Sequence, residues 1–174
     1  SVIEFYPSQG YTVFMGLMAA FQVVLARHAQ QYDFCIGMPT AGRHRPELES
    51  LIGFFINGVL VRADLQGNPT WASHLGKVKQ RILDVMAHQE TPVQLIVDKL
   101  NIPRDPSYPP LAQVGFQLQN FSSSLQGDAA SQAIFRRIQA LTKLQIESIP
   151  LETADAKFDM IVSLAQNQET LSGY

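Results

Sequence analysis

The sequence predicts one α/β domain in which a mixed β-sheet is flanked by helices. Three stretches carry apolar residues at helical spacing. Apolar runs of strand length lie between them, and two later runs have one polar face, which favours a mixed sheet over a fully buried parallel one. At 174 residues the chain is long enough for one domain with a core and gives no reason to propose two.

The first third of the chain predicts a central helix and two strands. Thr12 is a suitable N-cap for a helix that ends near Ala29 and is apolar nearly all round, as expected for a covered helix. Residues 32–39 read as a short buried strand, followed by a polar loop over residues 40–49. A second strand, apolar on both faces, is predicted over residues 54–62.

Helical periodicity returns in the middle of the chain. From Thr70 onward, apolar residues recur three and four positions apart with charged residues between them, so we expect an amphipathic helix on the core. Thr91 and Pro92 form an N-cap with proline at the first helical position, which predicts a second helix over residues 93–100. Four prolines between residues 103 and 110 then exclude regular structure.

The last third predicts further strands. Residues 114–119 alternate apolar and polar side chains, the period of a strand with one apolar face, and residues 158–164 repeat this pattern. Residues 122–131 are rich in Ser, Gly, Ala and Gln, which predicts a surface loop, and residues 144–149 are a candidate for one further strand.

Composition excludes several classes of partner. The formal net charge is −2 and no Lys/Arg cluster is present, so nucleic acid and anionic membranes lack an electrostatic basis for binding. Charged residues make up 16% of the chain, below the roughly 25% of an average domain, which predicts that another lobe or protein covers part of the surface. With Cys35 as the sole cysteine and no targeting segment, the cytoplasm is the expected location.

No motif for independent chemistry is visible. The four histidines are dispersed without a metal-binding spacing, so no metal site is expected. Serine-hydrolase, phosphate-loop and dinucleotide motifs are also missing. His88 lies near Glu90 and could be a general base, but at a helix end we favour a structural role in which its imidazole bonds the last carbonyls.

Three polar residues have both structural and functional interpretations. Asn57 lies in an apolar run, where its amide either holds a loop or lines a polar channel. Arg62 is expected to pair with a local acid such as Asp64. Arg43 could bind a carboxylate or phosphate, but Glu47 and Glu49 are nearby structural partners.

Four segments in one order resemble the C-terminal half of a condensation domain of a non-ribosomal peptide synthetase. The segments are Asp33–Arg43, Ile52–Arg62, His88–Pro92 and Arg104–Ser107. The similarity extends from about residue 12 to residue 173, so residues 1–174 read as one C-terminal lobe. The family's catalytic motif, His-His followed three residues later by Asp-Gly, belongs to the N-terminal lobe and is absent here.

The resemblance implies a two-lobed fold like that of chloramphenicol acetyltransferase. Between its lobes, a carrier-bound acceptor amine attacks a donor thioester on a second carrier protein and forms a peptide bond. Both substrates are tethered by phosphopantetheine, so no cofactor is expected on this lobe itself. The implied partners are the N-terminal lobe, the carrier proteins and adjacent synthetase domains, in the biosynthesis of antibiotics and other secondary metabolites.

The same resemblance assigns roles to residues. Asn57 and the stretch Gly37, Met38, Pro39 and Thr40 are expected to face the substrate tunnel, and no residue of this lobe is expected to be catalytic. Motif residues expected to preserve local structure are Arg43, Gly53, Arg62, His88, Arg104 and Asp105.

The sequence departs from the family pattern in two places. Gly58 stands where the family usually has Thr, and Tyr108 and Pro109 replace the usual Arg-Asn. Two alternatives stay open. The first is a non-catalytic relative that recruits a carrier protein or partner enzyme, and the second is a free-standing acyltransferase that would depend on His88. We expect the isolated chain to be inactive in condensation, because its histidines lack the motif context.

Overall fold

The computed structural model describes residues 1–119, 142, 158–166 and 170–173. The chain divides into two compact units, Ser1–Gln117 with Phe158–Ile161, and Leu118–Lys157 with Val162–Tyr174. Strands β3 and β4 each have residues in both units.

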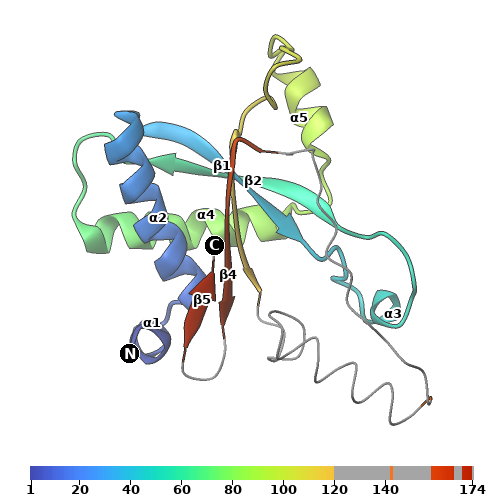
Figure 1. The fold of residues 1–174 in the computed structure, drawn as a ribbon, viewed down its shortest axis with the longest axis horizontal. Helices are drawn as coiled ribbons and strands as arrows, with labels where there is room; N and C mark the ends of the chain where they lie inside the picture. The colour runs from blue at the N-terminus through green and yellow to red at the C-terminus, as the bar shows by residue number, and fades with distance from the viewer. Residues whose placement is uncertain (120–141, 143–157, 167–169, 174) are drawn as a thin grey trace. The chain divides into compact units, whose positions relative to one another are not determined.

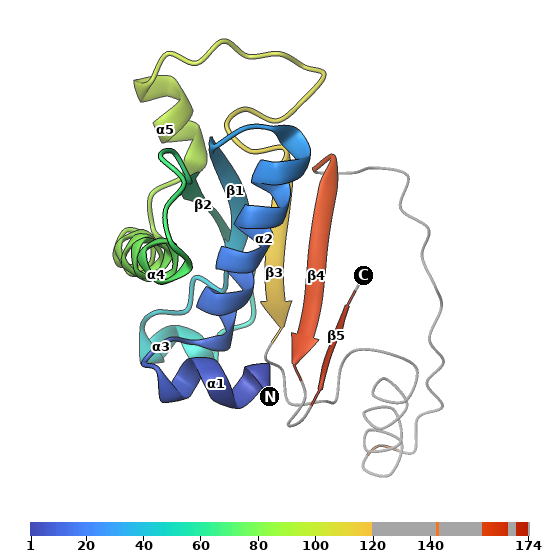
Figure 2. The same ribbon diagram turned by 90° about the vertical axis from the view of Figure 1, so that its left-hand side faces the viewer.

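The first unit holds the described helices and most of the strands (Figure 1). Its helices are α1 (Val2–Ser8), α2 (Val13–Ala29), α3 (Pro46–Glu49), α4 (Trp71–Ala87) and α5 (Val93–Lys99). Its strands are β1 (Asp33–Thr40), β2 (Asn57–Asp64), most of β3 (Val114–Gln119) and the start of β4 (Met160–Gln166). Figure 2 shows β2, β1 and β3 side by side, with α2 in front of them.

The sheet of this unit is mixed, as predicted. Strand β1 runs antiparallel to β2 in a register from Asp33 opposite Asp64 to Thr40 opposite Asn57. On its other side β1 is parallel to β3, with Gly37 opposite Gly115. Among the described strands, β2 therefore lies at one edge of the sheet, and β1 is paired on both sides.

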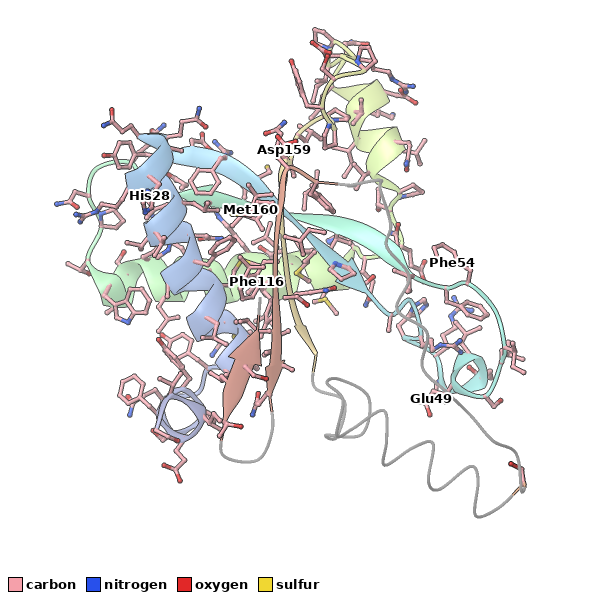
Figure 3. The ribbon with its side chains drawn as sticks, viewed as in Figure 1. His28, Glu49, Phe54, Phe116, Asp159 and Met160 are labelled. Carbon is pink, nitrogen blue, oxygen red and sulfur yellow. The ribbon has the colours of Figure 1, made fainter. Side chains whose placement is uncertain are left out.

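The core lies between the sheet and helices α2 and α4. Phe116 of β3, 2% exposed and labelled in Figure 3, stacks against Phe21 and also meets Phe14, with ring centroids 5.3 and 5.6 Å apart. The other large apolar side chains that are fully or almost fully buried are Met18, Ile36, Val61 and Val78. Burying side chains of this size contributes about 1.5–3 kcal/mol each.

Both long helices begin as the sequence predicts. The Oγ1 atom of Thr12 accepts a hydrogen bond from the amide of Met15 at 3.1 Å. The Oγ1 atom of Thr70 likewise accepts a hydrogen bond from the amide of Ser73 at 3.3 Å, so both helices have side-chain caps. Helix α4 packs against α2 and β2 and buries one apolar stripe, which confirms the amphipathic helix.

Several predicted boundaries are wrong. Strand β2 begins at Asn57, not at residue 54, and its side chains alternate between buried and exposed because helix α4 covers one face. Helix α5 ends at Lys99 and has Pro92 as its N-cap. The short helices α1 and α3 were not predicted, because α3 is a single turn inside the polar loop and α1 contains Pro7.

The second unit contains an antiparallel strand pair among its described residues. The end of β4 runs antiparallel to β5 (Leu171–Gly173), with Leu164 opposite Gly173. A side chain at Gly173 would lie 2.4 Å from both Leu164 and the carbonyl oxygen of Ser163, so glycine is required by this close approach. The predicted loop at 122–131 and strand at 144–149 lie outside the described residues.

Among the described helices, none has by itself the length and apolar composition needed to cross a membrane. Helices α1 and α2 meet that test only as a pair, and they are bent by 107° at the break between them.

Candidate substrate-facing site

The paired ends of β1 and β2 bring together most of the residues predicted to face the tunnel. Thr40 lies opposite Asn57, and its hydroxyl donates a hydrogen bond to the Asn57 carbonyl oxygen at 3.3 Å. Pro39, opposite Gly58, is exposed, whereas Met38 is buried. Thr40 is buried as well, so exposed Pro39 and half-buried Asn57 are the accessible residues of the predicted set at this end of the sheet.

Gly37 lies farther inside the sheet than the other predicted residues. A Cβ atom at this position would lie 2.8 Å from the ring of Phe158, so the strand can pass that ring only without a side chain. The position has a clear packing reason for glycine, and a part in lining the tunnel remains a prediction.

Asn57 holds a loop, which is one of the two alternatives that the sequence left open. Its Nδ2 atom donates to the carbonyl oxygen of Gln89 at 2.6 Å and to that of Thr91 at 3.4 Å. These bonds join the start of β2 to the turn between α4 and α5. The same amide therefore gives a hydrogen-bond donor to two main-chain carbonyls of that turn. A channel role for Asn57 stays a prediction.

Arg43 anchors the loop between β1 and β2. Its Nη1 atom donates to the carbonyl oxygens of Leu48 and Glu49, and its guanidinium lies 4.5 Å from the ring centroid of Phe55. The partners are therefore main-chain carbonyls and an aromatic ring, not the Glu47 and Glu49 carboxylates that the sequence suggested. The guanidinium caps α3 at its carbonyl end and fixes the segment that follows.

Gly42 permits that arrangement. Its φ of +64° is in the left-handed region, and a Cβ there would lie 1.8 Å from the carbonyl oxygen of Phe55. A side chain is excluded by both conformation and space. The loop thus returns closely onto itself before β2 begins.

The histidines near this loop have structural partners. His88 is the C-cap of α4, and its Nδ1 atom lies 2.8 Å from the carbonyl oxygen of Asp84, as the structural interpretation predicts. Glu90, the acid nearest in sequence, instead pairs with Nε2 of His44 at 2.5 Å. This contact is a second connection between the β1–β2 loop and the α4–α5 turn.

Arg62 pairs with a different acid from the one predicted. It forms a bidentate ion pair with Asp33 on the adjacent strand, in which Nε and Nη2 donate to the two carboxylate oxygens at 2.7 and 2.6 Å. Asp64 instead pairs with Arg81, whose Nη2 atom lies 3.5 Å from Oδ2. The Arg62 guanidinium lowers the pKa of the Asp33 carboxyl, and Asp33 raises the pKa of Arg62. Cross-strand neighbours determine the pairing, which spacing along the chain does not show.

A family comparison covers nearly the whole chain. Residues 2–172 match the family model described as the Condensation domain. The chain belongs to the condensation-domain family.

Relatives and solved structures agree with this assignment. A linear gramicidin synthase of Brevibacillus parabrevis is 42% identical over 160 residues, which are 91% of this chain and 2% of that protein. In a complex of the X-domain and OxyB from teicoplanin biosynthesis, a chain at 22% identity superposes with a TM-score of 0.79, covering 99% of this chain and 36% of that one. The condensation domain of the Monacolin K polyketide synthase MokA is 19% identical and superposes with a TM-score of 0.71. This match covers 98% of this chain and 36% of that one.

The two structures show the fold shared by condensation domains, and the chain spans a small part of the curated relatives it matches. The expected fold class, a mixed sheet flanked by helices in a lobe of this two-lobed fold type, is confirmed.

The remaining motif residues of this condensation-domain segment have local roles. Arg104 pairs with Asp98 of α5 at 2.5 Å, and Asp105 accepts a hydrogen bond from the amide of Ser107 at 2.8 Å. Gly53 faces the ring of Phe55, 3.0 Å from where a Cβ would lie. Within the described part of the chain, no three His, Cys, Asp or Glu side chains are placed to hold a metal ion.

Two ionisable groups, the half-buried Cys35 and the buried His74, lie away from this site. Burial raises the pKa of the Cys35 thiol, so a thiolate is disfavoured. His74 on α4 is 2% exposed, and its Nε2 atom lies 3.3 Å from the carbonyl oxygen of Ala19. Desolvation lowers the pKa of His74, which favours the neutral imidazole.

Sequence reasoning missed the contacts that connect the two loops. The Asn57–Gln89 and His44–Glu90 pairs join segments more than 30 residues apart, and the Arg43–Phe55 contact closes the loop. One indication of these contacts was present in the sequence, because all three are made by residues within or directly beside the four family-like segments.

Proposed function

We propose that this chain is the C-terminal lobe of a condensation domain of non-ribosomal peptide synthesis. In that role it shapes the tunnel where a carrier-bound acceptor amine attacks a carrier-bound donor thioester. The family match over residues 2–172 carries the proposal, together with similarity to peptide synthetases. The family's histidine motif is absent from this sequence, so the proton-transferring group is supplied by the other lobe.

The chemistry left to this lobe is orientation. The N–C bond of the peptide forms as the acceptor nitrogen attacks the donor carbonyl, and the C–S bond breaks to release the donor carrier's thiol. Holding two tethered substrates in attack geometry can reduce the barrier by about 7–11 kcal/mol before any proton transfer. Asn57 and Pro39 are our candidates for this surface, because they are its accessible residues, and the Asn57 bonds to Gln89 and Thr91 give that side chain a defined position.

The partners follow from the proposal. Carrier proteins present both substrates on phosphopantetheine arms, and this chain binds no cofactor of its own. The N-terminal lobe of the same domain and the adjacent synthetase domains complete the assembly. The cytoplasm is the proposed location.

The decisive experiment compares this chain alone with the two-lobed domain that includes its upstream lobe. Each is mixed with two aminoacyl-loaded carrier proteins, and the acceptor carrier is read by intact-protein mass spectrometry. We expect a dipeptidyl acceptor carrier only with the two-lobed domain. Product from the chain alone would contradict the proposal, and the His88→Ala variant would then test the free-standing acyltransferase.

A matched pair of variants tests the tunnel assignment in the two-lobed domain. Asn57→Ala removes the amide at the candidate site, whereas Gln66→Ala changes an exposed polar residue after β2. We expect a lower rate of dipeptide formation for Asn57→Ala and an unchanged rate for Gln66→Ala. Equal rates for both variants would remove Asn57 from the site. A two-lobed domain that binds carriers but never forms product would instead favour the recruiting module.

A further inference from the structure

The segment Leu51–Ile56, which joins α3 to β2, exposes more large apolar surface than any other stretch of this length among the described residues. Ile52 is fully exposed and Phe54 is 87% exposed, while Leu51 and Ile56 are each about half exposed. Figure 3 shows Phe54 projecting from the loop beyond the end of the β1–β2 pair. Contiguous apolar patches on a protein surface usually mark an interaction site.

The exposure does not come from a loosely held loop. Arg43 bonds to the carbonyl oxygens of Leu48 and Glu49 and lies against the Phe55 ring, directly between the exposed side chains. Asn57 ties the far end of the segment to the α4–α5 turn. The backbone is fixed at both ends while the side chains point outward, so little conformational entropy remains to be lost when a partner binds.

The chemistry of the segment identifies the kind of partner. Between Glu49 and Arg62 no residue carries a charge. The nearby Arg43 guanidinium already bonds the Leu48 and Glu49 carbonyls and lies against the Phe55 ring, so the exposed side chains themselves offer nothing to an ionic ligand. A run of exposed aromatic and aliphatic side chains that contains no charged residue is typical of the buried centre of a protein–protein contact. The segment therefore suits an apolar protein surface.

The solved condensation-type chains indicate where that surface is found. This chain matches over nearly its whole length, yet it covers only 37% of the X-domain chain from teicoplanin biosynthesis and 36% of the MokA condensation domain. Nearly two thirds of the two-lobed fold therefore lies outside this lobe. The segment ends directly before Asn57, a candidate tunnel residue, so a partner lobe that faces the tunnel also reaches Leu51–Ile56.

We propose that Leu51–Ile56 is a preformed apolar contact that docks on the first lobe of the same condensation domain, with Ile52 and Phe54 as its anchors. The inference rests on the proposed function, since it takes the first lobe as the occupant.

The test uses cysteine labelling in the two-lobed domain. Phe54→Cys is placed in a Cys35→Ser background, and Val24→Cys on α2, 52% exposed, is the matched control. N-ethylmaleimide labelling of the relevant peptide is timed by mass spectrometry, with and without unfolding urea. We expect the native state to slow labelling at position 54 at least tenfold and at position 24 less than threefold. Equal slowing at both positions, or none at position 54, would overturn the proposal.

A second measurement distinguishes other occupants. In the 174-residue chain without the first lobe, we expect position 54 to label as fast as position 24. Slow labelling that depends on concentration, with a dimer in sedimentation, would assign the segment to a second copy. Slow labelling in a monomer would assign it to residues of this chain. Either result would overturn the proposal.

The proposed function is read separately on the same two-lobed samples. Dipeptide formation without protection at position 54 would refute the docking surface and leave the function standing. Protection without dipeptide formation would refute the function and leave the contact between lobes standing.

Discussion

Phe54 and Phe116 are the same residue type in two opposite environments. Phe116 is 2% exposed in the core beside Phe14 and Phe21, whereas Phe54 is 87% exposed on the loop before β2. The contrast also divides one continuous apolar run, because Val59 and Val61 of β2 are buried while Ile52 and Phe54, just before the strand, are not.

This contrast separates two reasons for apolar sequence. In β2 the buried side chains stabilise the lobe itself, since helix α4 covers that face. In Leu51–Ile56 the exposed apolar side chains contribute little to the fold of this chain, which is why we propose a contact outside it. Hydrophobicity along the chain marks both regions equally and does not say what covers them.

The largest expected effect is on stability and compares the loss of the Phe116 ring with the loss of the Phe54 ring. Phe116→Ala should lower the free energy of unfolding by roughly 3–5 kcal/mol, because it leaves a cavity in the aromatic cluster. Phe54→Ala should change it by less than about 0.5 kcal/mol in the 174-residue chain. Urea unfolding followed by circular dichroism measures both. Similar losses for the two variants would show that the exposed segment belongs to the core of this lobe.

Asn57 marks the border between the regions, and its loss should have the next largest effect. Asn57→Asp keeps the size of the side chain but removes the amide donor, leaving the Gln89 carbonyl without this bond. We expect a loss of about 1–3 kcal/mol of unfolding free energy, with Asn57→Ala similar. The neighbouring Gly58→Ala change, for which a Cβ meets no atom within 4 Å, is the control. If Asn57→Asp unfolded with the same free energy as the unmodified chain, the Asn57–Gln89 hydrogen bond would make no contribution to stability.

Arg43 tests whether the exposed segment is fixed rather than flexible. Arg43→Lys retains the charge but not the fork of donors or the flat contact with Phe55. We expect the free energy of global unfolding to fall by less than about 1 kcal/mol. Amide hydrogen exchange should become faster only in residues 48–56. Arg45→Lys, an exposed neighbour, should leave exchange unchanged. Unaltered exchange in Arg43→Lys would show that the guanidinium does not hold the loop.

The smallest expected effect concerns the buried side of the lobe and its pH dependence. Because the folded state lowers the pKa of His74, the unfolded chain binds more protons below the ordinary histidine pKa of about 6.5. Stability contributed by neutral His74 is therefore complete above that pH and decreases as the pH falls toward the lowered value. The slope of unfolding free energy between about pH 5 and 7 should diminish in His74→Gln.

A parallel series with His28→Gln, an exposed histidine on α2, separates this effect from general protonation. An identical slope in His74→Gln and the unmodified chain would contradict the assignment.

Local sequence determined the elements that depend on neighbours along the chain. Thr12 and Thr70 cap helices because a hydroxyl three residues before an amide can bond it without any tertiary contact. The alternation over residues 114–119 predicted β3, and the four family-like segments predicted the fold type. These features need only short-range geometry or a motif order that the chain displays directly.

Tertiary structure alone decided which apolar and polar groups meet. Helix α4 buries one face of β2, so a run that appears apolar throughout becomes a strand with two different faces and an exposed loop. The partners Asp33 for Arg62 and Gln89 for Asn57 lie about 30 residues away in sequence and become neighbours through strand register and the return of α4. Burial and pairing depend on distances in space, which spacing along a chain does not contain.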